Sequence, residues 1–311
     1  MDTLRKGDVA TPGQLAKQGI SQSQQRIMIR EGRLELMQRG VYADAARLRA
    51  AKDAASDGNP ALLHAFHVAA ALQSGRKLAA ASHQSAAILW GLDLLNPPPH
   101  DFVTLTRPPD GKGRRTNTDR LHIHVAPLAN DLCKRYGLPA TAAPRAVIDL
   151  ARSIPFMNGV VVADSALHSG TVTEAELSSK LLACERWAGS KQARQVIAFA
   201  DRRSESPLES CARVTFHKHK LPPPELQVET CHEGQFIARV DFLWPQFRTV
   251  AEADGLLKYS SRRDALAQLE RDKKLRAAGY KVVHFTYQQL FWETWRVIGW
   301  LRQAFAQPGP F

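Results

Sequence analysis

The pattern of apolar and polar positions in the first 45 residues predicts two short helices followed by a hairpin. Residues 11–19 and 22–31 each follow or include a Thr or Ser that can cap a helix, and each segment closes on a Gly. In the second helix we expect Ile27 on the buried face and the polar side chains in solvent. Residues 33–42 alternate and turn like a two-stranded wing. This order is typical of a winged helix-turn-helix, in which the second helix enters the major groove of DNA.

The middle of the chain has longer apolar segments. Residues 46–59 are rich in Ala and Arg, and we interpret them as a linker. An apolar helix is predicted from Pro60 to about Leu72. The other segments predict strands at residues 102–106 and 121–126, and helices at residues 82–91, 141–151, 157–169, 173–184 and 190–201.

The pattern changes again after residue 203. Pro207 opens a helix that carries Glu209, and alternating segments then predict three strands near residues 226–231, 236–243 and 247–253. A polar helix over 263–278, an apolar strand over 281–285 and an amphipathic helix over 292–305 complete this region. Helices that alternate with strands in this way indicate a mixed fold of the α/β (α+β) class.

These patterns predict three domains. They are a winged helix-turn-helix over residues 1–45, an α/β middle domain over residues 60–201 and a third α/β domain over residues 204–305. A chain of 311 residues is long enough for two or three domains of ordinary size.

The composition limits the cellular locations and the kinds of partner that we expect for this protein. The longest apolar runs fall well below the ~18 residues that cross a bilayer, and the first residues lack an apolar signal core. The four cysteines form no CxxC pair, which fits a reducing cytoplasm and excludes a readable zinc or redox motif. We therefore expect a cytoplasmic protein with no membrane partner.

The net charge of +12 is spread along the chain and is not concentrated in one tail. Such a field favours a polyanion such as DNA, through neutralisation of phosphates and release of counterions. The alternative is a solvated basic surface without a ligand. Candidate DNA-binding residues are Gln24, Gln25, Arg26 and Arg30 on the second helix, and Arg39 in the wing. A helix-turn-helix this short is also common in protein–protein contacts, so both interpretations stay open.

Four acidic residues in the C-terminal region suggest a chemistry. Asp241 lies at the end of one predicted strand, Glu252 and Asp254 lie on the next, and Glu209 lies on the preceding helix. Carboxylates from adjacent strands provide the hard oxygen ligands that Mg²⁺ needs beside a phosphodiester. Lys258 is the candidate cation for the developing charge. The alternatives are salt bridges for Asp241 and Glu252, and stabilisation of the helix dipole by Glu209.

The C-terminal region resembles the Vsr-like branch of the PD-(D/E)XK nuclease superfamily. The matching pieces, in order, are residues 206–210, 221–224 with Gln227, 240–245, 252–255 with Lys258 and Tyr259, Arg271, and 279–285. The resemblance implies a restriction-endonuclease-like domain over residues 204–305 that hydrolyses DNA with Mg²⁺. It implies Asp241 and Glu252 as metal ligands, with Asp254 or Glu209 assisting. Arg271 then contacts phosphate or forms part of a solvated face.

The front half resembles AbiEi-type bacterial antitoxins and transcriptional regulators. The matching pieces are residues 19–21, 32–34, 39–42, 82–87 and 141–151. The resemblance implies a DNA-binding head in a defence or toxin–antitoxin setting. Within it, we interpret His83 as a capping or buried structural residue.

One departure from the nuclease motif keeps a second interpretation open. The superfamily motif has a Lys where this chain has Asp254. Lys258 could substitute for it, or the domain could be catalytically silent and serve for DNA binding or homodimer formation in a repressor or antitoxin. A third interpretation is an antitoxin that neutralises a cognate nucleotidyltransferase toxin.

Overall fold

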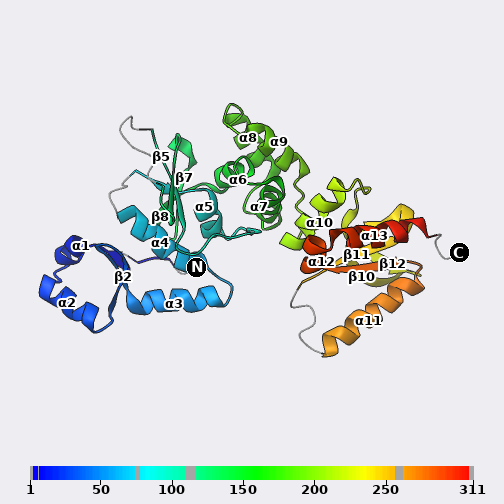
Figure 1. Ribbon diagram of the computed structural model, residues 1–311, viewed down its shortest axis with the longest axis horizontal. Coiled ribbons are helices and arrows are strands. Elements are labelled where there is room, and N and C mark those ends of the chain that lie inside the picture. Colours follow the sequence, from blue (N-terminus) through cyan, green and yellow to red (C-terminus); the bar gives the residue numbers. More distant parts are fainter. Residues whose placement is uncertain (1–2, 6, 74–77, 110–116, 256–261, 308–311) are drawn as a thin grey trace. The chain divides into compact units, whose positions relative to one another are not determined.

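The computed structural model describes residues 3–5, 7–73, 78–109, 117–255 and 262–307 (Figure 1). The chain divides into two compact units, Met1–Phe199 and Ala200–Phe311. The described residues form three sheets interleaved with helices, which confirms the mixed α/β class. The first unit contains both the head and the middle region that the sequence separates, and their domain identities stay predictions. No helix in the described part of the chain is long and apolar enough to cross a membrane.

The first unit begins with a small three-stranded sheet and two helices. The strands β1 (Val9–Ala10), β2 (Leu34–Gln38) and β3 (Val41–Asp44) are ordered β1-β3-β2. Between β1 and β2 lie α1 (Pro12–Lys17) and α2 (Gln22–Arg30), each with the capping box that its Thr or Ser predicts.

The prediction for the faces of α2 is partly wrong. Ile27 is 40% exposed, whereas Gln25 is only 6% exposed. The Gln25 amide donates hydrogen bonds to the carbonyl oxygens of Pro12 and Ile20, at 3.1 and 2.9 Å. Gln25 therefore fastens α2 to the start of α1, because a buried amide must find partners. In this conformation it cannot also reach a base edge.

The interpretation of residues 46–59 as a linker is also wrong, because α3 (Ala45–Ser56) occupies most of that segment. Asp44 caps α3 through the backbone N–H of Arg47 at 2.9 Å. Leu48 and Ala51 lie on its buried face and pack with Phe66 of α4 (Ala61–Gln73).

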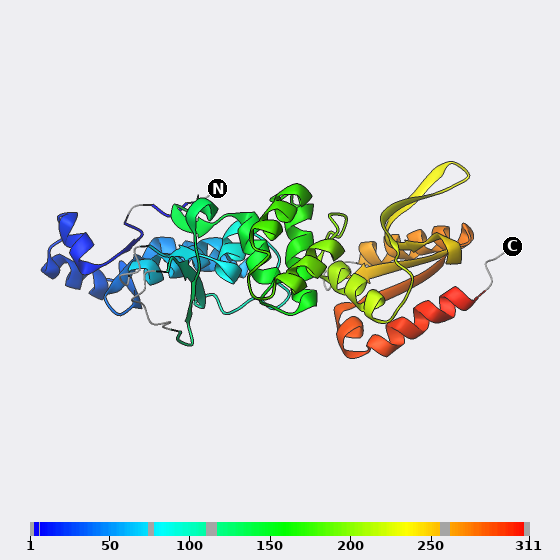
Figure 2. The ribbon, with the colours of Figure 1, turned by 90° about the horizontal axis from the view of Figure 1, so that it is seen from above.

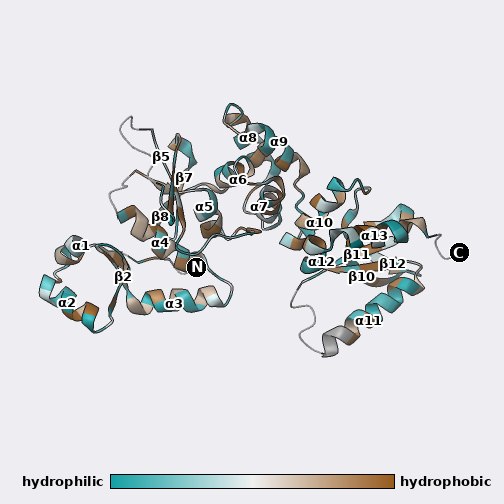
Figure 3. Ribbon diagram, viewed as in Figure 1, coloured by the Kyte–Doolittle hydropathy of each residue, from teal (hydrophilic) through white to brown (hydrophobic). Residues whose placement is uncertain are grey.

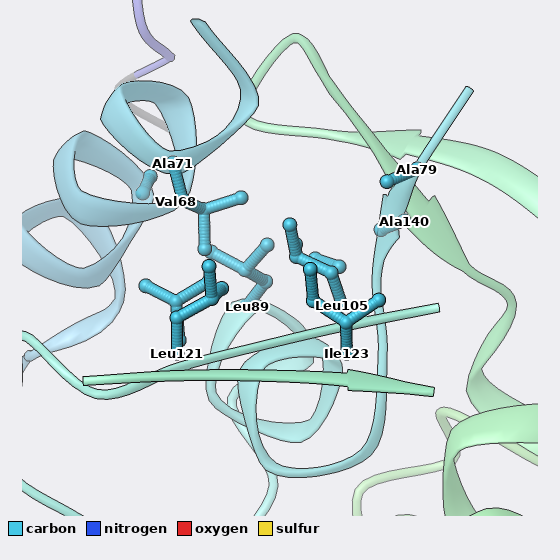
Figure 4. Packing of buried hydrophobic residues seen from close by; sticks show 11 residues of the cluster. Val68, Ala71, Ala79, Leu89, Leu105, Leu121, Ile123 and Ala140 are labelled. Atoms are coloured by element: carbon cyan, nitrogen blue, oxygen red, sulfur yellow. The ribbon is translucent and has the colours of Figure 1, made fainter. Parts of the chain in front are cut away.

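A five-stranded sheet forms the centre of the middle region, in the order β6-β5-β4-β8-β7. The structure confirms β5 (Val103–Arg107) and β6 (Leu121–Val125), whereas the short strands β4 (Ala80–Ala81), β7 (Leu132–Arg135) and β8 (Leu138–Thr141) were missed by the sequence patterns. The predicted helices are α5 (His83–Trp90), α6 (Ala143–Ala151), α7 (Phe156–His168), α8 (Glu174–Ala183) and α9 (Ser190–Phe199). Figure 4 shows Val68, Leu89, Leu105 and Ile123 packed together between this sheet and its helices.

The second unit is a four-stranded sheet in the order β12-β11-β10-β9. The strands β9 (Glu225–His232), β10 (Gln235–Trp244) and β11 (Thr249–Asp254) are antiparallel, and β12 (Lys281–Thr286) runs parallel to β11. In Figure 2 the β9–β10 hairpin, in yellow, extends beyond the rest of the sheet. The crossover between β11 and β12 contains α11 (Arg262–Ala277), which is largely hydrophilic (Figure 3).

Helices cover both faces of this sheet. On one face Leu275 of α11 packs with Leu243 and Val250. On the other, the aromatic rings of Phe242 and Trp244 meet Phe216 of α10 (Pro207–Lys218), with ring centroids 5.4 and 5.5 Å away. The chain ends with α12 (Tyr287–Trp292) and α13 (Thr294–Ala306).

Candidate active site

Asp241 and Glu252 face each other across two paired strands. The antiparallel register pairs Phe242 of β10 with Ala251 of β11, so the preceding Asp241 lies opposite the following Glu252. Side chains at opposite positions of an antiparallel pair share a face. Both carboxylates line one pocket of about 360 Å³, together with Gln227, Arg239 and Arg271 among other residues.

Gln227 joins two of the predicted acids. Its Nε2 donates to Glu209 Oε2 at 2.9 Å and to Asp241 Oδ1 at 3.2 Å. The other oxygen of Asp241, Oδ2, accepts from the backbone N–H of Ala253 at 2.9 Å. The backbone of Gln227 has a φ of 52°, a left-handed conformation that a side chain of this size adopts only at a cost. Backbone strain that holds a side chain between two carboxylates is typical of functional sites.

Glu209 lies in the first turn of α10 and is 7% exposed. It accepts hydrogen bonds from the Glu205 backbone N–H and the Ser206 hydroxyl, at 3.0 and 2.7 Å. Burial and the nearby negative charge of Asp241 raise the pKa of Glu209, and the hydrogen bonds that it accepts only partly offset them. A carboxyl group with a raised pKa is suited to proton transfer where it can reach the reacting groups.

Arg271 of α11 forms an ion pair inside the pocket. Its Nη2 donates to Glu252 Oε1 at 2.8 Å and also to the carbonyl oxygen of Arg239. The side chain of Arg271 is 24% exposed and that of Glu252 is 1% exposed. The guanidinium thus places a positive charge on a buried carboxylate inside the pocket.

Asp254 contacts a histidine that the sequence patterns did not single out. His284 of β12 has its Nδ1 3.1 Å from Asp254 Oδ2 and its Nε2 3.0 Å from Asp272 Oδ2. Burial lowers the pKa of His284, but the hydrogen bond and the charges of the two carboxylates outweigh it, so that the pKa is raised. A polar residue inside an apolar strand was the signal that could have identified His284.

The residues present can hold Mg²⁺ only in its sparsest protein arrangement. Among the described residues, no group of three or more His, Cys, Asp and Glu side chains is placed to share a metal ion. Mg²⁺ is nevertheless often held by one or two carboxylates, with water and substrate phosphate completing its shell. Asp241 and Glu252 fit that pair. Lys258 lies outside the described residues.

The candidate DNA-binding residues of the head lie mostly on its surface. Gln24, Arg26 and Arg30 of α2 are exposed, as is Arg39 in the turn between β2 and β3. Gln24 also accepts a hydrogen bond from the Ser21 backbone N–H at 2.8 Å, as part of the capping box. The three arginines can therefore contact a ligand without unfolding any element.

No family model matches the chain. The chain is similar to two uncharacterized proteins of Mycobacterium tuberculosis, Rv2248 of strain H37Rv and MT2308 of strain CDC 1551. Each is 32% identical over 147 residues, which cover 47% of this chain and 54% of the relative. The chain thus spans about half the length of the curated relatives that it matches. Among solved structures, the crystal structure of the Rv2827c protein of Mycobacterium tuberculosis aligns with 73% of this chain and 82% of its own, at 15% identity and a TM-score of 0.39.

Proposed function

We propose that this protein binds DNA and hydrolyses phosphodiester bonds in its C-terminal unit. The observation that carries the proposal is the pair Asp241 and Glu252, which line one pocket, with Asp241 joined through Gln227 to the buried Glu209. Carboxylates in close proximity repel one another and are costly to bury, so clusters of them are common at functional sites. Basic groups in the same pocket suit a phosphate.

The charged residues that line the pocket, and Glu209 next to Gln227, have chemical roles in this proposal. A bound Mg²⁺, held by Asp241 and Glu252, would polarise the scissile phosphate and the attacking water. Arg271 and Arg239 are placed to donate to the phosphate oxygens, which carry the negative charge that grows in the transition state. Glu209, with its raised pKa, accepts the proton of the attacking water.

The head supplies the affinity for DNA in this proposal. Arg26 and Arg30 project from α2, and Arg39 projects from the wing. Contacts of this kind neutralise phosphates and position the protein on the duplex. The charge of +12 and the resemblance to AbiEi-type regulators support a bacterial defence or toxin–antitoxin setting, with a cognate toxin as a further candidate partner.

The test is nicking of supercoiled plasmid DNA by purified protein, with and without Mg²⁺. We expect Mg²⁺-dependent nicking by the wild type and a loss of at least about a hundredfold in Asp241→Asn, because that change removes a metal-ligand charge. Glu229→Gln is the matched control, because Glu229 is an exposed acid on the neighbouring strand β9. DNA binding, measured in parallel by fluorescence anisotropy, should be the same in all three proteins. Inactive wild type across divalent metals and DNA forms would refute the catalytic proposal.

A specific observation favours a second candidate function. Glu252 is already paired with Arg271, and Asp254, at the position of the motif lysine, is paired with His284. Both pairs suit a nuclease fold that is catalytically silent and acts in a DNA-binding repressor or antitoxin, as a monomer or a homodimer. Tight DNA binding by the wild type without nicking would select this function over the first.

A further inference from the structure

Two helices, α5 and α6, begin close to the ends of the neighbouring inner strands β4 and β8 of the five-stranded sheet. The parallel strands β4 and β8 pair Ala81 with Ala140, so the residues that follow, Ser82 and Thr141, lie side by side. His83 comes directly after Ser82. The indole N–H of Trp90, at the far end of α5, donates to the Thr141 carbonyl oxygen at 3.0 Å. The helices α5 and α6 begin here, and their amino ends carry partial positive charge.

Neither α5 nor α6 has a side chain that caps its amino end. The N-cap residue of α5 is Ser82 and that of α6 is Ala142, and neither side chain accepts a hydrogen bond from the backbone of its own helix. The Ser82 hydroxyl lies 3.1 Å from His83 Nδ1. It is also 2.8 Å from the Thr106 hydroxyl, which donates to it. No N-cap side chain therefore takes up the first backbone N–H groups of either helix; in α6 these belong to Ala143 and Arg145, because Pro144 has none.

Three buried polar atoms belong to the segments where these two helices begin. Within the described part of the chain, the buried side-chain nitrogen and oxygen atoms that lack a hydrogen-bond partner are His83 Nε2, Thr141 Oγ1 and Arg145 Nη2. All three residues are at most 2% exposed. Arg145 belongs to the first turn of α6, and its charge acts on His83. Unpartnered buried polar atoms are rare in folded proteins, and three on these adjoining segments indicate a missing partner.

Cationic side chains outnumber carboxylates in the ion-pair cluster around Arg145. Arg145 donates to Asp149 at 2.7 Å and to Asp131 at 2.6 Å. Asp149 also accepts from Arg152 at 3.0 Å, and Asp131 also pairs with Lys180. Three cationic side chains thus share two carboxylates, which leaves an excess of one positive charge. An arginine N–H can only donate, and a hydroxyl and a ring N–H can donate, so the complementary ligand is an acceptor with several oxygens.

We propose that His83, Thr141 and Arg145 hold a compact oxyanion, with the chemistry of inorganic phosphate, between the amino ends of α5 and α6. The enclosure of the three residues favours a free ion over a phosphate that is part of a larger molecule. The residues come from two segments, 82–87 and 141–151, that have no role in the candidate active site. The site is independent of phosphodiester hydrolysis and of the second unit.

Thr141→Val tests the proposal, because it replaces the unpartnered hydroxyl by a methyl group of the same shape. Isothermal titration of the full chain with inorganic phosphate should give one ion per chain for the wild type and about tenfold weaker binding for the variant. Thr141→Ser keeps the hydroxyl and should restore the wild-type affinity. Thr104→Val is the matched control, because Thr104 is a buried threonine of the same sheet whose hydroxyl already lies 3.5 Å from Gln84 Oε1. Its phosphate affinity should equal that of the wild type.

Thermal unfolding gives a second readout that does not depend on calorimetric heat. At a phosphate concentration of about a hundred times Kd, the melting temperature of the wild type should rise by about 5 °C more than that of Thr141→Val. Comparison between variants removes the general stabilisation by phosphate, which acts on any folded protein. Deoxyadenosine monophosphate, titrated in a separate arm, should not bind at this site.

Three results of these titrations would overturn the oxyanion proposal. An equal response of the wild type and Thr141→Val to phosphate means an adventitious ion only, and overturns the proposal. Absence of binding by the wild type also overturns it, as does a response to deoxyadenosine monophosphate without one to phosphate. Loss of nuclease activity in Asp241→Asn has no bearing on this site, so the two proposals fail independently.

Discussion

Replacement of Arg271 by Met should show how much the ion pair between Arg271 and Glu252 stabilises the candidate active site. Arg271 donates to the Glu252 carboxylate at 2.8 Å, and Glu252 is 1% exposed. Removal of the cationic partner leaves a buried carboxylate with much of its neutralising charge gone. Loss of one partner of a buried ion pair costs about 3–5 kcal/mol. We therefore expect Arg271→Met to lower the free energy of unfolding of the second unit by about 3 kcal/mol.

The measurement is urea denaturation of the full chain, with hydrogen exchange of the β10 and β11 peptides used to assign the transition to the second unit. Glu252→Gln and the double variant complete a cycle. In the double variant no buried charge is left unpaired, so its loss should be smaller than the sum of the two single losses by at least about 1 kcal/mol.

Addition of Mg²⁺ extends the same experiment to the proposed metal site. A cation that binds Asp241 and Glu252 replaces the charge that Arg271→Met removes. Mg²⁺ should therefore stabilise this variant more than it stabilises the wild type, in proportion to RT ln(1 + [Mg²⁺]/Kd).

Two results would refute this reasoning. The first is a fall of less than about 1 kcal/mol in the free energy of unfolding of Arg271→Met. A fall that small is typical of an exposed ion pair and would mean that water reaches Glu252. A variant that does not respond to Mg²⁺, in a protein of unchanged fold, would contradict the proposed metal site and leave the silent nuclease fold as the better candidate.

Three further predictions concern the first unit. Arg26→Ala and Arg30→Ala should each weaken DNA binding and reduce the slope of log K against log salt concentration by about 0.9, measured by anisotropy at several salt concentrations; an unchanged slope would remove these residues from the interface. Burial lowers the pKa of His64 from 6.5 to about 4 in the folded protein, so the unfolded chain takes up the proton first. The contribution of neutral His64 to the free energy of unfolding is complete above pH 6.5 and should fall by about 3 kcal/mol toward pH 4. Urea denaturation at several pH values should show a smaller fall for His64→Gln. Gly189→Ala should cost more than about 2 kcal/mol, because φ is +82° and the added Cβ would lie 2.1 Å from a backbone oxygen; Gly170→Ala, where φ is +67° and no atom lies within 4 Å of the added Cβ, is the control that should cost less.

Local signals in the sequence predicted most of the elements correctly. Ser21 and Thr11 identify the starts of α2 and α1, because a cap acts within four residues of itself. The alternation around Asp241 identifies β10, because side chains on a strand alternate between its two faces. The pair of acids on adjacent strands is also readable, since only a short turn separates β10 from β11.

Features that depend on distant partners were not readable in the sequence. The strand β4 has two residues and exists because β5 and β8 bond to it on either side. Gln25 is buried because its amide finds carbonyl oxygens at both ends of α1, and nothing in α2 itself shows this.

The candidate site shows the same division. The sequence alone determined that Asp241 and Glu252 belong to adjacent strands, because spacing and alternation are local properties of the chain. Only the tertiary structure decided that Arg271 neutralises Glu252, that His284 engages Asp254, and that Gln227 joins Asp241 to the helix before the sheet. These contacts join residues 14 to 30 positions apart, and hydrogen bonds across such distances depend on how the sheet and its helices pack.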